Sequence, residues 1–226
     1  ADGEFEGFEI KGKYYKGKEF MDYLEKRIIQ AYFLPDDDPR KESATDLMYY
    51  LWCGAKSPLF GKDAMRTFEN YFIEDAEARK EHMNPYYKLS ETEECCNKIF
   101  EEFGLPTEGC HIINGHIPVK IKEGQSPIKA NGKLYVIDGG LSKAYQKKTG
   151  IGGYTLIFNS NNLSLAEHMP FHPEEDSTPK VFVTERMRKR ILVGDTDRGK
   201  ELEKKINDLK ELRTAFQKGL IKEKGN

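Results

Sequence analysis

The stretch Ile112-Ile113-Asn114-Gly115-His116-Ile117-Pro118-Val119 decides the fold predicted for this chain. A short apolar run ends in Asn-Gly-His and Pro118 then stops it, which predicts a buried strand with one imidazole at its C-terminal tip. A second edge of this kind follows in residues 134–140, where an apolar run ends in Asp138-Gly139-Gly140. Loops at strand ends often carry metal ligands and catalytic groups, so His116 is the first candidate for chemistry, although a lone histidine is more often a structural residue bonded to a backbone carbonyl.

Composition excludes several classes of protein. The 226 residues are 38% hydrophobic, which is enough for one large domain or two small ones. Lys plus Arg is 36 and Asp plus Glu is 38, so no global basic charge attracts nucleic acid. Neither a membrane span nor a signal peptide is visible, and we expect a cytoplasmic protein.

The four cysteines show neither a C-x-x-C spacing nor a disulfide framework. Cys95 and Cys96 are adjacent in a helical pattern, and Cys53 and Cys110 stand apart from them. We expect four reduced thiols, with a zinc site as the minor alternative.

The hydrophobic pattern predicts an α+β fold, with mainly helices before residue 108 and mainly strands after it. We expect three parts: a helical segment 1–108, a β-rich core 109–199, and a C-terminal helix and tail 200–226. The predicted helices are Tyr14 to Phe33, 43–52 (capped by Ser43, or starting at Thr45-Asp46), Asp63 to Ile73 with Met65, Phe68, Phe72 and Ile73 buried, Ser90 to Phe103, and 200–219. The predicted strands are 4–10, 109–116, 133–138, 153–158, 163–169, 181–183 and 191–193.

Several polar residues near the two strand edges are candidates for binding. Asn114 would orient His116, contact phosphate or simply cap the strand, and Asp138 would support a metal-bound histidine or, as we prefer, form an Asp-Gly turn. Residues 139–146 are a glycine-rich approach to a helix, which suits an anion but lacks the spacing of a nucleotide-binding loop. The possible phosphate contacts are Lys129, Lys133, Lys143 and Tyr145, although each taken singly is more often a solvated side chain.

Two further segments have a functional and a structural interpretation. Residues 52–62 combine Trp, Phe, Ser-Pro and lysines, so they would form one wall of an anionic-substrate pocket or, as we prefer, a packed loop with solvated lysines. Gly194-Asp195-Thr196-Asp197-Arg198-Gly199 is similar to a metal-binding phosphoesterase motif but is one residue too short. We interpret its Asp-Arg-Gly as the cap of the last helix.

Seven blocks of the sequence form a recognisable set: Leu51-Trp52-Cys53-Gly54, Ser57-Pro58-Leu59-Phe60-Gly61-Lys62, Asn84-Pro85-Tyr86-Tyr87, Ile113-Asn114-Gly115-His116-Ile117-Pro118-Val119-Lys120, Ser126-Pro127-Ile128-Lys129-Ala130, Val136-Ile137-Asp138-Gly139-Gly140, and Ser142-Lys143-Ala144-Tyr145-Gln146 with Thr149-Gly150-Ile151. Together they resemble the third class of fructose-1,6-bisphosphatases, the Firmicutes type, over about residues 5–216.

The resemblance implies part of a calcineurin-like metallophosphoesterase β-sandwich flanked by helices. It implies a two-manganese site that hydrolyses the 1-phosphate of fructose 1,6-bisphosphate in gluconeogenesis, with a metal-bridging hydroxide attacking phosphorus. Asn-Gly-His-x-Pro matches a late motif of that superfamily, so His116 carries over as a metal ligand, with Ile117 replacing the usual Thr. Asn114, Lys120, Lys129, Lys143 and Tyr145 are then candidate substrate contacts, which no motif assigns.

The early metal-binding motifs of the superfamily have no counterpart in this sequence. Because a dinuclear site needs several carboxylate, imidazole and amide ligands, and because the first residue is Ala1 rather than Met, we expect the C-terminal portion of a longer enzyme. The remainder of that polypeptide would be its partner, a homo-oligomer is possible, and the chain alone would be inactive. The alternative is a non-catalytic module for regulation or oligomerisation.

Overall fold

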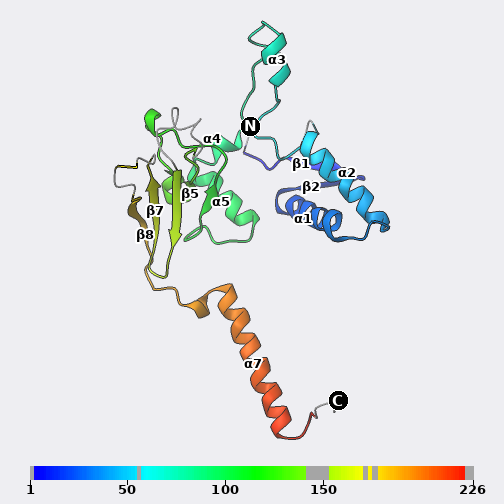
Figure 1. Cartoon of the computed structure of the whole chain (residues 1–226), viewed down its shortest axis with the longest axis vertical. Coiled ribbons are helices and arrows are strands. Elements are labelled where there is room, and N and C mark those ends of the chain that lie inside the picture. The colour runs from blue at the N-terminus through cyan, green and yellow to red at the C-terminus, as the bar shows by residue number, and fades with distance from the viewer. Residues whose placement is uncertain (1–2, 55–56, 141–152, 170–172, 175–177, 222–226) are drawn as a thin grey trace. The chain divides into compact units, whose positions relative to one another are not determined.

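A computed structural model describes residues 3–54, 57–140, 153–169, 173–174 and 178–221. These residues form a mixture of helices and small sheets, which confirms the predicted α+β class (Figure 1). The phosphoesterase sandwich stays a prediction. Two compact units divide the chain: unit 1 contains Ala1–Ile113 and Ile128–Tyr135, and unit 2 contains Asn114–Pro127 and Val136–Asn226. The three parts predicted from the sequence also stay a prediction.

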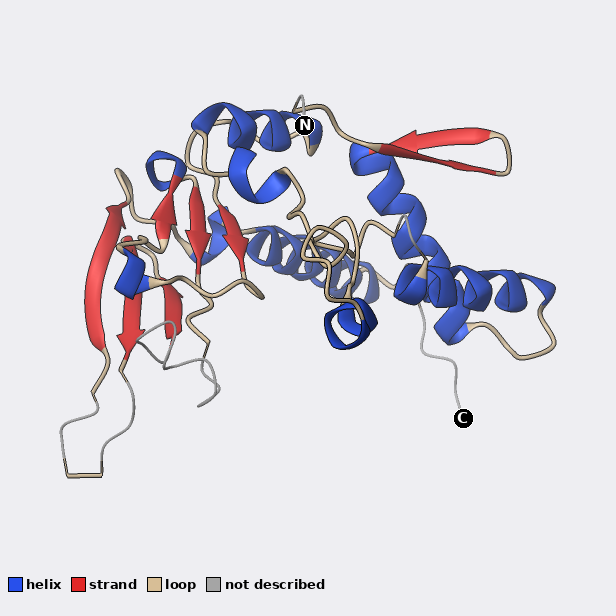
Figure 2. Cartoon of the chain, turned by 90° about the horizontal axis from the view of Figure 1, so that it is seen from above, coloured by secondary structure: helices blue, strands red, loops and turns tan. Residues whose placement is uncertain are grey.

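Unit 1 begins with a hairpin in which β1 (Gly7–Ile10) pairs antiparallel with β2 (Lys13–Lys16) (Figure 2). The turn residues Lys11 and Gly12 have φ values of 51° and 76°. Two positive φ values give a turn whose twist matches that of the flanking strands. The prediction of helix from Tyr14 is therefore wrong at its start, because this turn carries the next residues back along β1.

The helices α1 (Gly17–Phe33) and α2 (Pro39–Cys53) pack together and close a small core with the hairpin. Phe20, Leu24 and Leu51 are its buried members. Burial of each such side chain contributes about 1.5–3 kcal/mol. The α2 helix starts earlier than predicted because Asp38, and not Ser43, caps it: the Asp38 carboxylate accepts a hydrogen bond from the Arg40 N–H, and Pro39 occupies the first turn.

The prediction for residues 63–73 is wrong in length and in burial. The helix α3 covers only Thr67–Phe72, and Met65, Phe68 and Phe72 are 70–79% exposed. Helical spacing of apolar residues predicts a buried face only when another element covers it, and no described element covers this short helix.

The helices α4 (Tyr86–Leu89) and α5 (Glu93–Glu102) follow, and α5 buries Cys96 and Phe100. The Thr92 hydroxyl accepts a hydrogen bond from the Cys95 N–H and donates one to the Leu89 carbonyl. One side chain therefore makes hydrogen bonds both to the end of α4 and to the start of α5.

We expect Thr92→Ala to lower the free energy of unfolding by about 1 kcal/mol, since it removes the cap of α5. Denaturant titration of the chain measures this change. Thr92→Ser is the matched control because it keeps the hydroxyl. Equal losses in the Ala and Ser variants would show that the methyl group matters and the cap does not.

A three-stranded sheet has the order β3-β5-β4, with β3 at Ile112–Asn114, β4 at Ile128–Lys129 and β5 at Leu134–Val136. The pairing of β4 with β5 is antiparallel across the single turn η2 (Ala130–Gly132). Leu134 and Tyr135 of the central strand are 1% exposed. The edge strand β3 is half-exposed, so the predicted buried strand before His116 is wrong in its burial.

Unit 2 contains a second three-stranded antiparallel sheet, β6 (Gly153–Phe158), β7 (Asn162–His168) and β8 (Lys180–Arg186), in that order. The hairpin predicted around residues 159–162 is confirmed: the Asn159 side chain accepts hydrogen bonds from the N–H groups of Asn161 and Asn162. Residues 191–193 are not the predicted strand. They lead into the turn η3 (Val193–Asp195), where the Leu192 N–H donates to the Asp195 carboxylate.

The last helix, α7 (Asp197–Gln217), is capped at its N-terminus by Thr196, whose hydroxyl accepts a hydrogen bond from the Gly199 N–H. Gly199 has to be glycine, because a Cβ atom there would lie 1.8 Å from the Val193 carbonyl oxygen of η3. None of the helices in the described ranges is long and apolar enough to cross a membrane.

Candidate functional site

The loop that carries His116 is fastened at both of its ends within unit 2. The Ile137 N–H donates to the Asn114 carbonyl at 2.9 Å, and the Val119 N–H donates to the Asp138 carbonyl at 2.7 Å. Val119 is only 2% exposed, so it anchors the far end of the loop by packing as well. Residues 115–118 therefore form a short bridge between two fixed points, as the glycine and proline in the sequence indicated.

His116 occupies the strained position of this bridge. Its φ is +70°, and the Ile117 N–H donates across it to the Gly115 carbonyl at 2.9 Å. A three-residue turn with a central φ of about +75° is the rare, strained form of the γ-turn. Strain at a residue other than glycine is often retained where a side chain has to be aimed for function.

The imidazole of His116 is exposed, and no other described residue makes a hydrogen bond or ion pair with it. It is thus free, among these residues, to bind a metal ion through either ring nitrogen. The described ranges contain no group of three or more His, Cys, Asp or Glu side chains that would hold such an ion. His116 therefore fits one ligand of a metal site, and the described residues do not fit a complete dinuclear site.

Asp138 forms the Asp-Gly turn that the sequence favours for it. Its Oδ1 atom accepts a hydrogen bond from the Gly140 N–H at 2.8 Å, which is an aspartate turn. Asn114 is half-buried and its carbonyl is part of the loop anchor. All four cysteines are free thiols.

The predicted substrate contacts belong to different units of the chain. Lys120 shares unit 2 with Asn114 and His116, and its ammonium lies 3.2 Å from the Glu123 carboxylate. Lys129 belongs to unit 1, where its ammonium forms an ion pair with Glu91 and its side chain is 20% exposed. Lys143 and Tyr145 lie outside the described residues.

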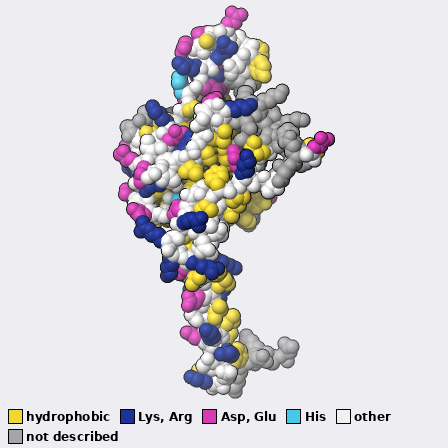
Figure 3. Space-filling view, turned by 90° about the vertical axis from the view of Figure 1, so that its left-hand side faces the viewer, with side chains coloured by type: hydrophobic (Ala, Val, Ile, Leu, Met, Phe, Trp, Pro, Cys, Tyr) yellow, Lys and Arg dark blue, Asp and Glu magenta, His cyan; other side chains and the backbone are white. Residues whose placement is uncertain are grey.

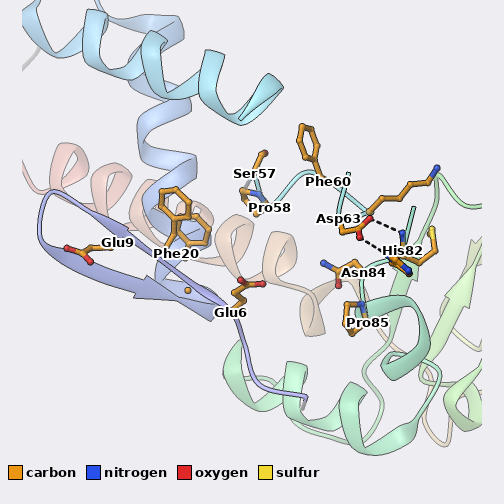
Figure 4. A pocket seen from close by; sticks show the side chains of 14 residues that line it. Glu6, Glu9, Phe20, Ser57, Pro58, Phe60, Asp63, His82, Asn84 and Pro85 are labelled. Atoms are coloured by element: carbon orange, nitrogen blue, oxygen red, sulfur yellow. Dashed lines mark hydrogen bonds and ion pairs between the residues drawn. The ribbon is translucent and has the colours of Figure 1, made fainter. Parts of the chain in front are cut away.

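Unit 1 contains a separate hollow of about 710 Å³ (Figure 4). Part of its lining comes from the segment 52–62, through Ser57, Pro58, Phe60 and Lys62, so this segment contributes to a pocket wall. Trp52 is 74% exposed and is not among the lining residues. The remaining lining residues are Glu6, Gly7, Phe8, Glu9, Phe20, Asp63, His82, Met83, Asn84 and Pro85.

No prediction from the sequence included the pair Asp63 and His82, which lines part of this hollow. The Asp63 carboxylate accepts the His82 N–H at 2.8 Å and contacts His82 Nδ1 at 2.8 Å, and the Asp63 N–H donates to the His82 carbonyl. The hydrogen bond from the His82 backbone, followed by that from its side chain, lowers the pKa of Asp63. No short motif signals this pair, because the two residues are separated by 19 positions.

Two further polar groups at this hollow have partners beyond its lining. The Lys62 ammonium lies 2.5 Å from the Glu81 carboxylate, and the buried Ser57 hydroxyl donates to the Leu51 carbonyl at 2.6 Å. Both contacts help to hold the segments that line the hollow.

We expect the His82 amide to report the titration of Asp63. Because the pKa of Asp63 is lowered in the folded chain, its hydrogen bonds are complete above the ordinary value of 3.8 and are lost as the pH falls through the lowered pKa. An NMR pH titration of the His82 amide shift measures the midpoint.

In that titration Asp63→Asn removes the transition, whereas Asp37→Asn, on an exposed loop, leaves it in place. A midpoint at or above 3.8 in the unmodified chain would contradict the role assigned to Asp63.

The sequence profile described as Firmicute fructose-1,6-bisphosphatase matches residues 1–218. The chain belongs to this family. A class 3 fructose-1,6-bisphosphatase of Finegoldia magna is 49% identical over all of this chain and 35% of its own length. Those of Clostridioides difficile and Bacteroides thetaiotaomicron are 51% and 48% identical, over 98% and 99% of this chain and 35% of their lengths. No solved structure matches.

The chain thus spans about a third of the length of the curated relatives it matches. The resemblance noted for the seven sequence blocks is confirmed at the level of the family. The role of His116 and of the five substrate-contact candidates stays a prediction.

Proposed function

We propose that this chain is the C-terminal portion of a fructose-1,6-bisphosphatase, an enzyme that hydrolyses the 1-phosphate of fructose 1,6-bisphosphate. The observation that carries the proposal is the identity of about half of all residues to three relatives of that name, across essentially the whole chain. Their sequences are about three times as long, so the activity belongs to the longer polypeptide, and this chain supplies a part of the site. Gluconeogenesis in the cytoplasm is the process that this reaction would serve.

In this proposal His116 is one ligand of a two-manganese centre whose other ligands lie mostly outside the chain. Three features support it: the Asn-Gly-His-x-Pro match, the strained turn at His116, and an imidazole without a hydrogen-bonding partner among the described residues. Both ends of the loop are anchored by backbone hydrogen bonds, so the position of the His116 backbone is held before a metal binds.

The candidate substrate contacts differ in availability. Lys120 is exposed, and its pairing with Glu123 is a surface ion pair of the kind that contributes little. The Lys129 ammonium would have to leave Glu91 to meet a phosphate, and its side chain is mostly buried. Lys120 is therefore the stronger candidate of the two, and Asn114, Lys143 and Tyr145 stay as proposed contacts.

We expect His116→Ala in the longer polypeptide to reduce manganese-dependent phosphate release at least about a hundredfold, since losses of metal affinity or activity from perturbed ligation are of this order. The readouts are phosphate release from fructose 1,6-bisphosphate and bound manganese measured on the purified protein by elemental analysis.

His168→Gln is the matched control, because His168 is a histidine of β7 whose ring contacts Thr155, and it is expected to leave both readouts near their original values. Unchanged manganese content and turnover in His116→Ala would refute the ligand assignment. If the unmodified longer polypeptide released no phosphate, this result would instead favour a non-catalytic module.

A further inference from the structure

A stripe of apolar side chains runs along α7 and is not covered by any described element. Leu202, Ile206, Leu209 and Phe216 are 40–63% exposed, although leucine and isoleucine in a packed helix are normally buried. The turn η3 packs against the start of α7, at Gly199. Figure 3 shows the hydrophobic side chains gathered on one side of this helix, the lowest element of the view, beside its charged residues.

The spacing of the stripe is that of a helix-pairing seam. The positions alternate in steps of three and four residues, which is the heptad pattern that brings two helices together. The inward positions, a and d, are Gly199, Leu202, Ile206, Leu209, Arg213 and Phe216; the flanking positions, e and g, are Arg198, Glu203, Lys205, Lys210, Leu212 and Gln217.

We propose that α7 pairs in the antiparallel direction with α7 of a second copy of this chain. The charges decide the direction. In a parallel pair, equivalent a positions face each other, so Arg213 would oppose Arg213 of the second copy. The g position would also meet the following e position, which places Lys205 against Lys210 and Arg198 against Glu203. The second of these pairs is attractive and offsets the first, so the facing Arg213 side chains are what disfavours the parallel direction.

One antiparallel register converts these repulsions into attractions. When Ile206 opposes Leu209 of the second copy, Arg213 opposes Leu202, and its aliphatic stem covers an apolar partner. In the same register Glu203 lies opposite Lys210, and the two-fold symmetry of the pair forms this ion pair twice. A shift by one heptad in either direction would set Lys210 against Lys210 or Glu203 against Glu203 instead.

The end of the seam fits this register. Gly199 occupies an inward position and lies against the Val193 carbonyl, so η3 forms the last part of the stripe. Leu192 and Val193 are 57% and 74% exposed there. Phe216 of the second copy falls opposite Gly199, where these two side chains offer an apolar surface to its ring.

The test is the association of the longer polypeptide to which this chain belongs, measured by sedimentation equilibrium, with charge exchanges at Glu203 and Lys210. We expect a dimer whose dissociation constant rises about tenfold in Glu203→Lys and in Lys210→Glu, because each change turns two attractive pairs into repulsive ones. The double exchange Glu203→Lys with Lys210→Glu restores the original constant. Because the two residues are seven positions apart in one helix, they do not contact each other within it, and rescue requires a second copy.

Glu211→Lys is the matched control, since residue 211 lies on the outer side of the helix and its charge change leaves the dissociation constant unaltered. Circular dichroism verifies that each variant keeps its helix content. Tighter association of Lys210→Glu would indicate the parallel direction and overturn the proposal. A chain that stays monomeric at all concentrations, or a double exchange without rescue, would overturn it as well.

Discussion

The hydrogen bonds on both edges of β5 are the constraint on which the candidate metal ligand depends. On one edge β5 pairs with β4, and on the other edge the residue just after β5, Ile137, holds the carbonyl of Asn114. Leu134 and Tyr135 are almost fully buried, so β5 has little freedom to shift. The loop is tied at residues 114 and 119 by backbone hydrogen bonds, and His116 adopts a positive φ between them. A strained backbone conformation persists only where the surrounding structure holds it, and here it sets the direction in which the His116 side chain leaves the backbone.

Local signals predicted the elements that depend mainly on local contacts. The β6–β7 hairpin and α7 follow from alternation, turn residues and helical spacing, each of which acts over a few residues. The early start of α2 at Pro39 also has a local signal, because aspartate is a favourable N-cap and proline favours the first helical turn. Ser43 was an equally valid cap by residue type alone. Only the position of the preceding loop, Leu34 to Asp38, distinguishes the two.

The wrong predictions share a physical cause: each element depends on whether residues far away in the sequence pack against it or form hydrogen bonds with it. Residues 191–193 are rich in β-branched and apolar side chains, but Ile191 donates to Ser160 and Leu192 to Asp195, so no strand neighbour remains for them. The aromatic side chains of α3 have helical spacing and no described covering surface. For the same reason the sequence indicated where His116 would lie but not its strained φ, because the loop is held by the Ile137 N–H, which donates to Asn114, and by the Asp138 carbonyl, which accepts from Val119. The Asp63–His82 pair depends on contacts over similar separations, and no motif could have shown it.

Exposure of apolar side chains has a different meaning on α3 and on α7. On α3 the exposed aromatic residues lie on a helix of 6 residues, which is too short to form a continuous seam. On α7, a helix of 21 residues, exposed apolar residues recur from Leu202 to Phe216 with charges beside them, so their pattern carries information about direction and register that exposure alone does not. A helix that only had to meet an arbitrary apolar surface would need no charged residue at an inward position. Arg213 breaks the stripe of α7 where an antiparallel partner presents leucine, and where a parallel partner would present a second arginine. The one residue that weakens the seam is therefore also the residue that selects its geometry, in the way that a polar group at a buried helix position trades stability for specificity.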